Sequence, residues 1–230
     1  MIPSFLRRSF LIGVSLILCG SQHAVASIPA SNPHWEPEIK AMEARARLKP
    51  AVAGTDAIVF VGSSSIRLWK TLDRDFPGLR VYNHGFGGSY LIDTIAYADR
   101  IVFPLRPATI VLYAGTNDIN GGVPPETLAV QFKQFVEMVR EQLPNTRILY
   151  IAVASNPARW HLREKIQRAN RLIEEQTRLD ERLGFIDAFA AMLGPDGQPL
   201  PDIFVEDGLH MNAKGYAIWT ELVRPHLAKP

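Results

Sequence analysis

The chain has 230 residues, of which 47% are hydrophobic and 21% are charged, an ordinary composition for a globular protein. This length suits one domain with a sizeable core and would be cramped for two domains. The 25 basic and 23 acidic residues give a formal charge of +2, and Arg7 and Arg8 account for the whole surplus. A nearly neutral body without a lysine and arginine cluster argues against nucleic acid as a partner, because phosphate binding needs a basic surface.

Residues 1–26 have the features of a targeting segment. Arg7 and Arg8 form a positively charged start, Phe10 to Leu18 is mostly apolar, and Ala24-Val25-Ala26 supplies the small residues that a signal peptidase requires. The apolar run is too short for a permanent membrane span. A buried N-terminal helix would explain neither the paired arginines nor the Ala-x-Ala ending. We therefore predict a signal peptide, export to the periplasm or the outside of the cell, and no membrane span after cleavage.

The export route and the single cysteine add two narrower expectations. Arg7-Arg8-Ser9-Phe10-Leu11 resembles a twin-arginine export signal, although adjacent arginines also occur in ordinary signals. Lipid anchoring at Cys19 is disfavoured, because Leu18 is not the small residue that precedes a lipoprotein cysteine. Cys19 is the only cysteine, so a mature chain that begins near Ser27 would have no disulfide and no thiolate metal site.

The predicted elements alternate between short apolar runs and longer amphipathic stretches. Residues 27–50 are expected to be a proline-rich lead-in with a short helix at Glu38–Leu48, and residues 51–230 a single domain. The predicted strands are Ala57–Val61, Leu79–Tyr82, Thr109–Tyr113, Ile148–Val153 and Phe185–Ile186, and the predicted helices between and after them are Ile66–Phe76, Tyr90–Val102, Pro125–Gln142, Arg159–Leu183 and Ala213–Leu227.

This alternation predicts an α/β fold with a parallel sheet covered by helices on both faces. We expect a three-layer α/β/α sandwich of the flavodoxin-like type, with about five parallel strands. The charged segment that begins at Arg159 is interpreted as a solvated helix face. Ligands of such sheets bind beyond the carboxyl ends of the strands, so the loops at that edge are the place to look for chemistry.

Four polar clusters fall at this edge. Each of them alone could cap a helix or form a turn. Four together, on one edge of one sheet, favour an active site instead. The clusters are Gly62-Ser63-Ser64-Ser65 after the first strand, Asn83 to Ser89 after the second, Gly115-Thr116-Asn117-Asp118 after the third, and Asp207-Gly208-Leu209-His210 before the last helix.

In these clusters the chain resembles the SGNH hydrolases, also called the GDSL esterase and lipase family. The resemblance extends from about Ala57 to Trp219, nearly the whole chain after the signal. It rests on four blocks that carry the serine, glycine, asparagine and histidine for which the family is named. It implies a serine esterase, lipase or carbohydrate deacetylase on the fold predicted above.

The residues that match the blocks are Ser64, Gly88, Asn117 and the pair Asp207 and His210. The resemblance implies that Ser64 is the nucleophile, that His210 is its general base and that Asp207 orients the imidazole, since a serine hydroxyl needs a base to become nucleophilic. The backbone N–H groups of Ser64 and Gly88 and the side-chain amide of Asn117 would form the oxyanion hole.

Other residues near these blocks are less specific. Ser63 stands where the family usually has an aspartate, which raises the question of how the Ser64 loop is held. His84 is either a substrate contact or a hydrogen-bonded loop histidine, and Trp160 either forms part of the pocket wall or packs at a helix start. The spacing of the acidic residues and histidines fits no metal site, so we predict no metal and no cofactor.

The expected activity is hydrolysis of carboxylic esters through an acyl-enzyme, with short acyl groups and a small-molecule or glycan substrate such as an acetylated polysaccharide. Two other functions remain open on the same fold. One is a non-catalytic envelope protein that binds a ligand or glycan, and the other is an acyltransferase that uses the same triad. The sequence does not separate acyl transfer from hydrolysis, and it does not determine the oligomeric state.

Overall fold

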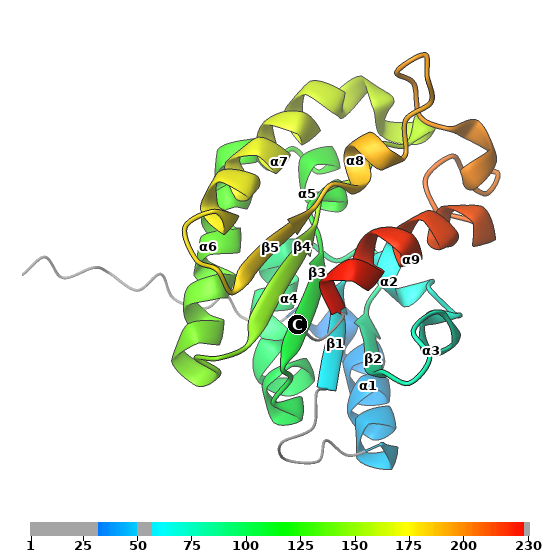
Figure 1. The fold of residues 1–230 in the computed structure, drawn as a ribbon. Coiled ribbons are helices and arrows are strands. Elements are labelled where there is room, and N and C mark those ends of the chain that lie inside the picture. The colour runs from blue at the N-terminus through cyan, green and yellow to red at the C-terminus, as the bar shows by residue number, and fades with distance from the viewer. Residues whose placement is uncertain (1–31, 50–56, 228–230) are drawn as a thin grey trace, which may run out of the picture.

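The computed structural model describes residues 32–49 and 57–227 (Figure 1). The predicted signal peptide, residues 1–26, lies outside the described residues. Five parallel strands form one sheet in the order β2-β1-β3-β4-β5, which is the flavodoxin-like order. The predicted three-layer α/β fold is therefore confirmed. The strands are β1 Ala57–Gly62, β2 Arg80–Gly85, β3 Thr109–Tyr113, β4 Arg147–Ile151 and β5 Leu183–Ile186.

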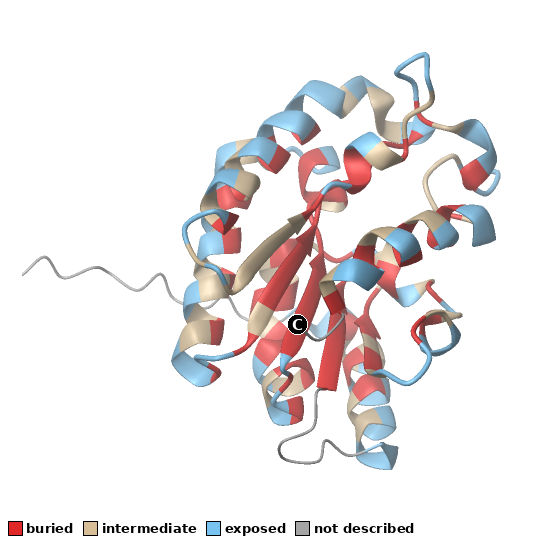
Figure 2. Ribbon diagram, in the orientation of Figure 1, coloured by how far each residue is buried: buried red, intermediate tan, exposed pale blue. Residues whose placement is uncertain are grey.

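The central strands are buried on both faces, as their continuous apolar sequences predict (Figure 2). Every residue of β1 and of β3 is buried, whereas β5 at the edge of the sheet is only partly covered. Alternate residues of β1 enter two separate cores. Val59 and Val61 pack into one, and Ile58 and Phe60 pack into the other.

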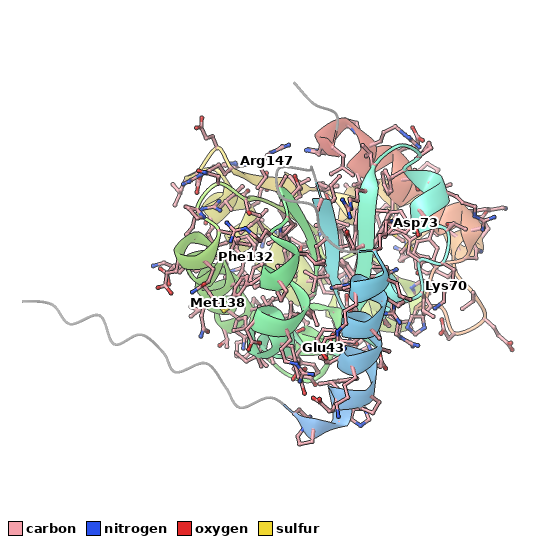
Figure 3. All side chains as sticks on the ribbon, turned by 90° about the horizontal axis from the view of Figure 1, so that it is seen from below. Glu43, Lys70, Asp73, Phe132, Met138 and Arg147 are labelled. Carbon is pink, nitrogen blue, oxygen red and sulfur yellow. The ribbon has the colours of Figure 1, made fainter. Side chains whose placement is uncertain are left out.

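Two helical layers cover the sheet, one for each core (Figure 1). In the view from below, Phe132 lies between its helix and the sheet, where its ring contacts that of Tyr150 at 5.2 Å between centroids (Figure 3). One layer consists of α1 Glu36–Leu48, α4 Leu91–Ile101, α6 Pro125–Gln142 and α7 Arg163–Thr177, the other of α2 Ser64–Arg67, α3 Leu72–Asp75, α8 Ala188–Ala191 and α9 Ala213–Leu227. The shorter elements are α5 Thr116–Asn120 and the 3-10 turns η1 Pro33–Trp35, η2 Phe103–Leu105, η3 Pro157–Leu162 and η4 Pro201–Ile203.

The predicted helix Ile66–Phe76 is wrong as one element. The structure has two short helices there, α2 and α3, joined by a turn at residues 68–71. The indole of Trp69 and the hydroxyl of Thr71 both donate hydrogen bonds of 2.6 Å to the Asp75 carboxylate, and these bonds stabilise the turn. The ring of Trp69 is buried against Tyr216 and Trp219, so tertiary packing overrides the helical periodicity.

Other predicted boundaries are also wrong. The strand predicted at Ile148–Val153 ends at Ile151. The segment predicted as one helix from Arg159 to Leu183 begins with the 3-10 turn η3, because the side chain of Asn156 caps the N–H of Arg159 at 2.9 Å. The helix α7 then ends at Thr177, before the strand β5. Strand β2 extends three residues beyond the predicted end at Tyr82 and takes in His84.

Candidate active site

The loops after β1, β2 and β3 lie side by side at the carboxyl edge of the sheet. The N–H of Ser63 donates to the carbonyl of Tyr113 at 3.0 Å, and the N–H of Phe86 donates to the carbonyl of Gly62 at 2.9 Å. Ser64 is the first residue of α2 and follows β1 closely, and Asn117 follows β3 closely. This is the point where the strand order reverses, at which open parallel sheets bind ligands.

Ser64, His210 and Asp207 form a continuous chain of hydrogen bonds. The Nε2 atom of His210 lies 3.0 Å from the Oγ of Ser64, and its Nδ1 lies 2.6 Å from Oδ2 of Asp207. The sequence separation between Ser64 and His210 is 146 residues, so only the fold brings the two side chains together. These are the three residues that the sequence grouped as nucleophile, base and orienting acid.

The hydrogen bonds of Asp207 determine the tautomer of His210. Desolvation raises the pKa of Asp207, but hydrogen bonds from the backbone and ring of His210 and from the N–H of Leu209 outweigh it and hold that pKa at about 2. The ionised carboxylate only accepts hydrogen bonds, so Nδ1 of the neutral imidazole must carry the proton. Nε2 is then free of hydrogen and accepts a bond from the Ser64 hydroxyl.

The turn from Asp207 to His210 is fixed by local contacts. Oδ1 of Asp207 accepts the N–H groups of Leu209 and His210, each at 2.8 Å. Gly208 has φ +61°, a left-handed conformation that glycine adopts without strain. Its carbonyl accepts the N–H of Ala158 at 3.0 Å, which joins this turn to the loop after β4.

Ser63 holds the loop of Ser64 through its backbone. Its carbonyl accepts the N–H groups of Ile66 and Arg67, each at 3.1 Å, and its own N–H bonds to Tyr113. Its side chain is 2% exposed and makes no capping bond to α2. Main-chain bonds at Ser63 therefore hold the loop of Ser64, with no capping bond from the Ser63 side chain.

Gly88 lies on a loop that the N-terminal helix braces. Its φ of +77° favours glycine, and a Cβ atom there would come within 3.4 Å of the Trp35 ring. The neighbouring N–H of Gly87 donates to a carboxylate oxygen of Glu38 at 3.1 Å. Within the described part of the chain, no acceptor is found for the N–H groups of Ser64 and Gly88, so both remain available to a ligand.

Both the NH₂ group and the oxygen of the Asn117 side-chain amide form hydrogen bonds. Its Nδ2 donates to the carbonyl of Ser89 at 3.1 Å, and its Oδ1 accepts from Nη1 of Arg159 at 3.0 Å. One of the two Nδ2 hydrogens is used by Ser89, which leaves the second for another acceptor. Asn117 is thereby tied to the residue that follows Gly88.

Asp118 connects the segment after β3, in which it lies, with the start of α4, which follows the Gly88 loop. Its Oδ1 accepts the N–H of Leu91 at 2.9 Å, at the start of α4. The side chain is fully buried, and its Oδ2 has no hydrogen-bond partner among the described residues. Burial raises the pKa of Asp118 to about 6, despite the opposing effect of the bond from Leu91.

Of the two alternatives for His84, the structure supports a hydrogen-bonded histidine, and burial of the side chain contradicts a substrate contact. His84 lies within β2, is 3% exposed, and its Nδ1 lies 2.5 Å from the carbonyl of Ile101 at the end of α4. Because an extra stretch of β2 places this side chain in the core, it acts as a hydrogen-bonded structural histidine. Burial lowers its pKa to about 4, so it is neutral near pH 7.

Trp160 is half-buried and stacks on Phe189, with 6.1 Å between ring centroids. The guanidinium of Arg163 covers its ring at 5.7 Å. These are packing contacts at the start of α7. A contact between Trp160 and a substrate stays a prediction.

Sequence reasoning missed Arg159, which it assigned to a solvated helix face. In the structure this side chain is half-buried and forms a hydrogen bond with Asn117. The available signal was its position, because Arg159 follows β4 at the same carboxyl edge as the four polar clusters.

One hollow among the described residues lies away from this site. A cavity of about 960 Å³ is found at the opposite edge of the sheet, where Gly78, Arg106 and Thr109 contribute to its walls. Within residues 32–49 and 57–227, no three acidic, histidine or cysteine side chains are grouped so that they could hold a metal ion. Over the same ranges, no helix has the length and apolar character that a membrane crossing requires.

Comparison with known proteins adds an independent result. Residues 38–218 match the model of the GDSL-like lipase/acylhydrolase family. Platelet-activating factor acetylhydrolase IB subunit alpha1 from Pongo abelii is 29% identical over 170 residues, which cover 70% of each chain.

Solved structures resemble this chain in fold. A GDSL-like lipase from Bacteroides thetaiotaomicron has 20% identity and a TM-score of 0.68, with 82% of this chain and 98% of that chain covered. An acetylxylan esterase from Geobacillus stearothermophilus, solved as a catalytic mutant, has 14% identity and a TM-score of 0.62, with 78% and 97% covered.

Proposed function

The chain belongs to the GDSL-like lipase/acylhydrolase family and is a carboxylic ester hydrolase, and we propose that Ser64, His210 and Asp207 carry out the reaction as a catalytic triad. The observation that carries this proposal is the unbroken hydrogen-bond chain from Ser64 Oγ through the imidazole to the Asp207 carboxylate. In this proposal Ser64 is the nucleophile, His210 is the general base and Asp207 orients the imidazole.

In the first half of the reaction, Ser64 Oγ attacks the ester carbonyl while its proton passes to Nε2 of His210. The imidazolium that forms is stabilised by the carboxylate of Asp207. The tetrahedral intermediate then collapses, the bond to the alcohol oxygen breaks, and His210 returns the proton to the leaving alcohol. The product left on the enzyme is an ester of Ser64.

In the second half, water replaces the alcohol. His210 removes a proton from water as the hydroxide attacks the acyl-enzyme, and it then protonates Ser64 as the acid departs. The negative oxygen that develops in both halves would be stabilised by the N–H groups of Ser64 and Gly88 and by the amide of Asn117. Loss of one such donor typically lowers kcat by about 10²–10³-fold.

Covalent labelling tests the triad directly. A fluorophosphonate should modify the wild-type protein once, and mass spectrometry of a digest should find the adduct on the peptide that contains Ser64. His210→Ala should label far more slowly, and Ser64→Ala should not label. Labelling of Ser63 or Ser65 instead, or none in the folded wild type, would contradict the proposal and favour a binding protein.

We further propose that the substrate is an ester of a short acyl group, such as an O-acetyl group on a carbohydrate. The side chains of His210 and Asp207 are 27% and 46% exposed, so the triad lies in an open rim. The names of two similar proteins, an acetylhydrolase and an acetylxylan esterase, point to the same class of acyl group. A p-nitrophenyl ester series from acetate to decanoate tests this, and a kcat/KM that rises with chain length would contradict it.

Export is a third proposal, and it rests on residues 1–26. Expression of the full chain with a C-terminal tag should give a processed protein outside the cytoplasm that begins near Ser27, as mass spectrometry would show. Replacement of Arg7 and Arg8 by lysine should block export only if the twin-arginine route is used. An unprocessed protein in the cytoplasm would overturn the proposal.

A further inference from the structure

Arg159 stands out because it is a half-buried cation with a neutral partner. Its Nη1 donates to Oδ1 of Asn117 at 3.0 Å, and within the described part of the chain it forms no ion pair with a carboxylate. Partial burial lowers the pKa of Arg159, although it stays cationic at any ordinary pH. A guanidinium that is partly removed from water without a counter-charge costs free energy, which suggests that its position serves the site.

The backbone of Arg159 is fixed from two sides. Its N–H donates to the side chain of Asn156 at 2.9 Å, and Asn156 is itself 3% exposed. The preceding N–H of Ala158 donates to the carbonyl of Gly208, within the turn that carries His210. The guanidinium therefore reaches Asn117 from a loop whose backbone is held by hydrogen bonds, and not from the solvent-exposed face of a helix.

Arg159 and Ser89 together determine which way the Asn117 amide points. A guanidinium only donates hydrogen bonds and a carbonyl only accepts them. If the amide turned by 180°, its NH₂ would face the donors of Arg159 and its oxygen would face the carbonyl of Ser89. Both contacts would be repulsive, so only the observed orientation satisfies both partners.

We propose that Arg159 is a positioning residue for ester hydrolysis, which holds and polarises the amide of Asn117 so that its second N–H is presented to the oxyanion. This inference rests on the proposed role of Asn117 in the oxyanion hole. The positive charge on the oxygen side of the amide draws electron density away from Nδ2, which makes its N–H a stronger donor. Among the described residues, Arg159 itself forms no hydrogen bond with Ser64 or His210.

The test is a double-mutant cycle with p-nitrophenyl acetate. Arg159→Ala should lower kcat by about 10–10²-fold with KM nearly unchanged, since the loss cannot exceed that of the donor it orients. Asn117→Ala should lower kcat at least as much, and Arg159→Ala should then have no further effect in the Asn117→Ala background. Arg159→Lys, which keeps the charge but not the planar fork, should restore part of kcat.

Arg163→Ala is the matched control, because this arginine lies on the same segment and covers Trp160 without contacting Asn117. It should keep kcat within about twofold of the wild type, and thermal unfolding should show that all variants are folded. Losses that multiply in the double variant would overturn the inference. A loss confined to KM, and larger for an anionic succinate ester than for acetate, would also overturn it by making Arg159 a substrate contact.

A second readout does not depend on turnover. In ¹⁵N NMR spectra, the side-chain NH₂ signals of Asn117, assigned by their disappearance in Asn117→Asp, should be resolved and slow to exchange. They should move and exchange faster in Arg159→Ala but not in Arg163→Ala. Unchanged Asn117 signals in Arg159→Ala would refute the positioning role, even in a protein that hydrolyses no tested ester. Failure of Ser64→Ala to abolish activity would instead refute the proposed function.

Discussion

Asp207 divides its two carboxylate oxygens between its own turn and the ring of His210. Oδ1 accepts two backbone N–H groups, and Oδ2 accepts Nδ1 of the imidazole. An asparagine in the same place would keep the turn but present NH₂ to the ring. Nδ1 would then have to accept, which places the proton on Nε2 and leaves Ser64 without a base.

For this reason Asp207→Asn should lower kcat by about 10²–10⁴-fold while the melting temperature changes little. Ester hydrolysis and thermal unfolding of the same preparation check both parts. Asp202→Asn is the control, because Asp202 pairs with Lys214 at the surface and takes no part in the triad. Equal activities of Asp207→Asn and Asp202→Asn would show that Asp207 does not orient the base.

Two buried groups should give stability opposite dependences on pH. Burial lowers the pKa of His84 from 6.5 to about 4, so between these values the unfolded chain binds a proton that the folded chain does not, and stability rises with pH. Burial raises the pKa of Asp118 from 3.8 to about 6, so there the folded chain holds the extra proton and stability falls with pH.

The two effects oppose each other in the wild type, so the prediction concerns differences between variants. From pH 4 to 6.5, the stability of the wild type minus that of His84→Gln should rise, and the wild type minus Asp118→Asn should fall. Each change should be on the order of 2–3 kcal/mol, from 1.36 kcal/mol for each pKa unit. Urea unfolding at several pH values measures this, and curves that run parallel to the wild type would contradict it.

At the scale of elements, the segment η1–α1 acts as a brace for the loop of Gly88. Trp35 packs edge-on against Phe86 with 5.5 Å between ring centroids and lies directly beside Gly88. One turn further along, Glu38 accepts the N–H of Gly87. The segment is anchored in turn by Arg100 of α4, which bonds to two glutamates of α1.

Trp35→Ala should therefore affect both stability and catalysis. Loss of a buried indole should lower the free energy of unfolding by about 3 kcal/mol, and a looser Gly88 loop should also lower kcat. Leu48→Ala, at the other end of α1 where the side chain is 88% exposed, should change neither. A Trp35→Ala protein with reduced stability but wild-type kcat would show that the brace is not functional.

The elements that were predicted well are those whose sequence pattern lies within the element itself. Pro125–Gln142 matches α6 because prolines at its start and one apolar face define it. Ala213–Leu227 matches α9, although Pro225 lies inside that helix. The turn between α2 and α3 was missed because burial of Trp69 decides it. The core position of His84 followed from pairing with β1, and the contact of Arg159 with Asn117 spans 42 residues, so neither could be predicted from neighbouring sequence.

The site residues were more accessible to sequence reasoning than the boundaries. Ser64 and Asn117 fall in short polar blocks after β1 and β3, and a parallel sheet places the carboxyl ends of its strands at one edge. Asp207 and His210 precede α9 instead, and the resemblance to the SGNH hydrolases is what identified them. The contacts that Ser63, Asp118 and Arg159 make around these residues could not be predicted, because they join segments that are distant in the sequence.

At the scale of the whole molecule, two cores share one sheet. Phe132 lies in the core beneath α6, and Trp219 lies in the core beneath α9, where it packs on Tyr113 at 4.7 Å between ring centroids. Because the strands contribute alternate residues to both cores, neither core can lose its packing without loss of the sheet.

Conservative truncations on either face should therefore weaken the same cooperative unit. Phe132→Leu and Trp219→Phe should each lower the free energy of unfolding by about 1–2 kcal/mol. Urea transitions followed by tryptophan fluorescence and by far-UV circular dichroism should coincide in both variants. Separate midpoints for the two probes would show that the two layers unfold independently.

The central claim is that Ser64 attacks an ester with His210 as its base. The most direct measurement is hydrolysis of p-nitrophenyl acetate by the purified protein beside Ser64→Ala and His210→Ala, with folding checked by circular dichroism. We expect wild-type turnover and a loss of about 10³-fold or more in each variant. Wild-type turnover that survives either substitution, or a folded wild type that hydrolyses no ester, would contradict it.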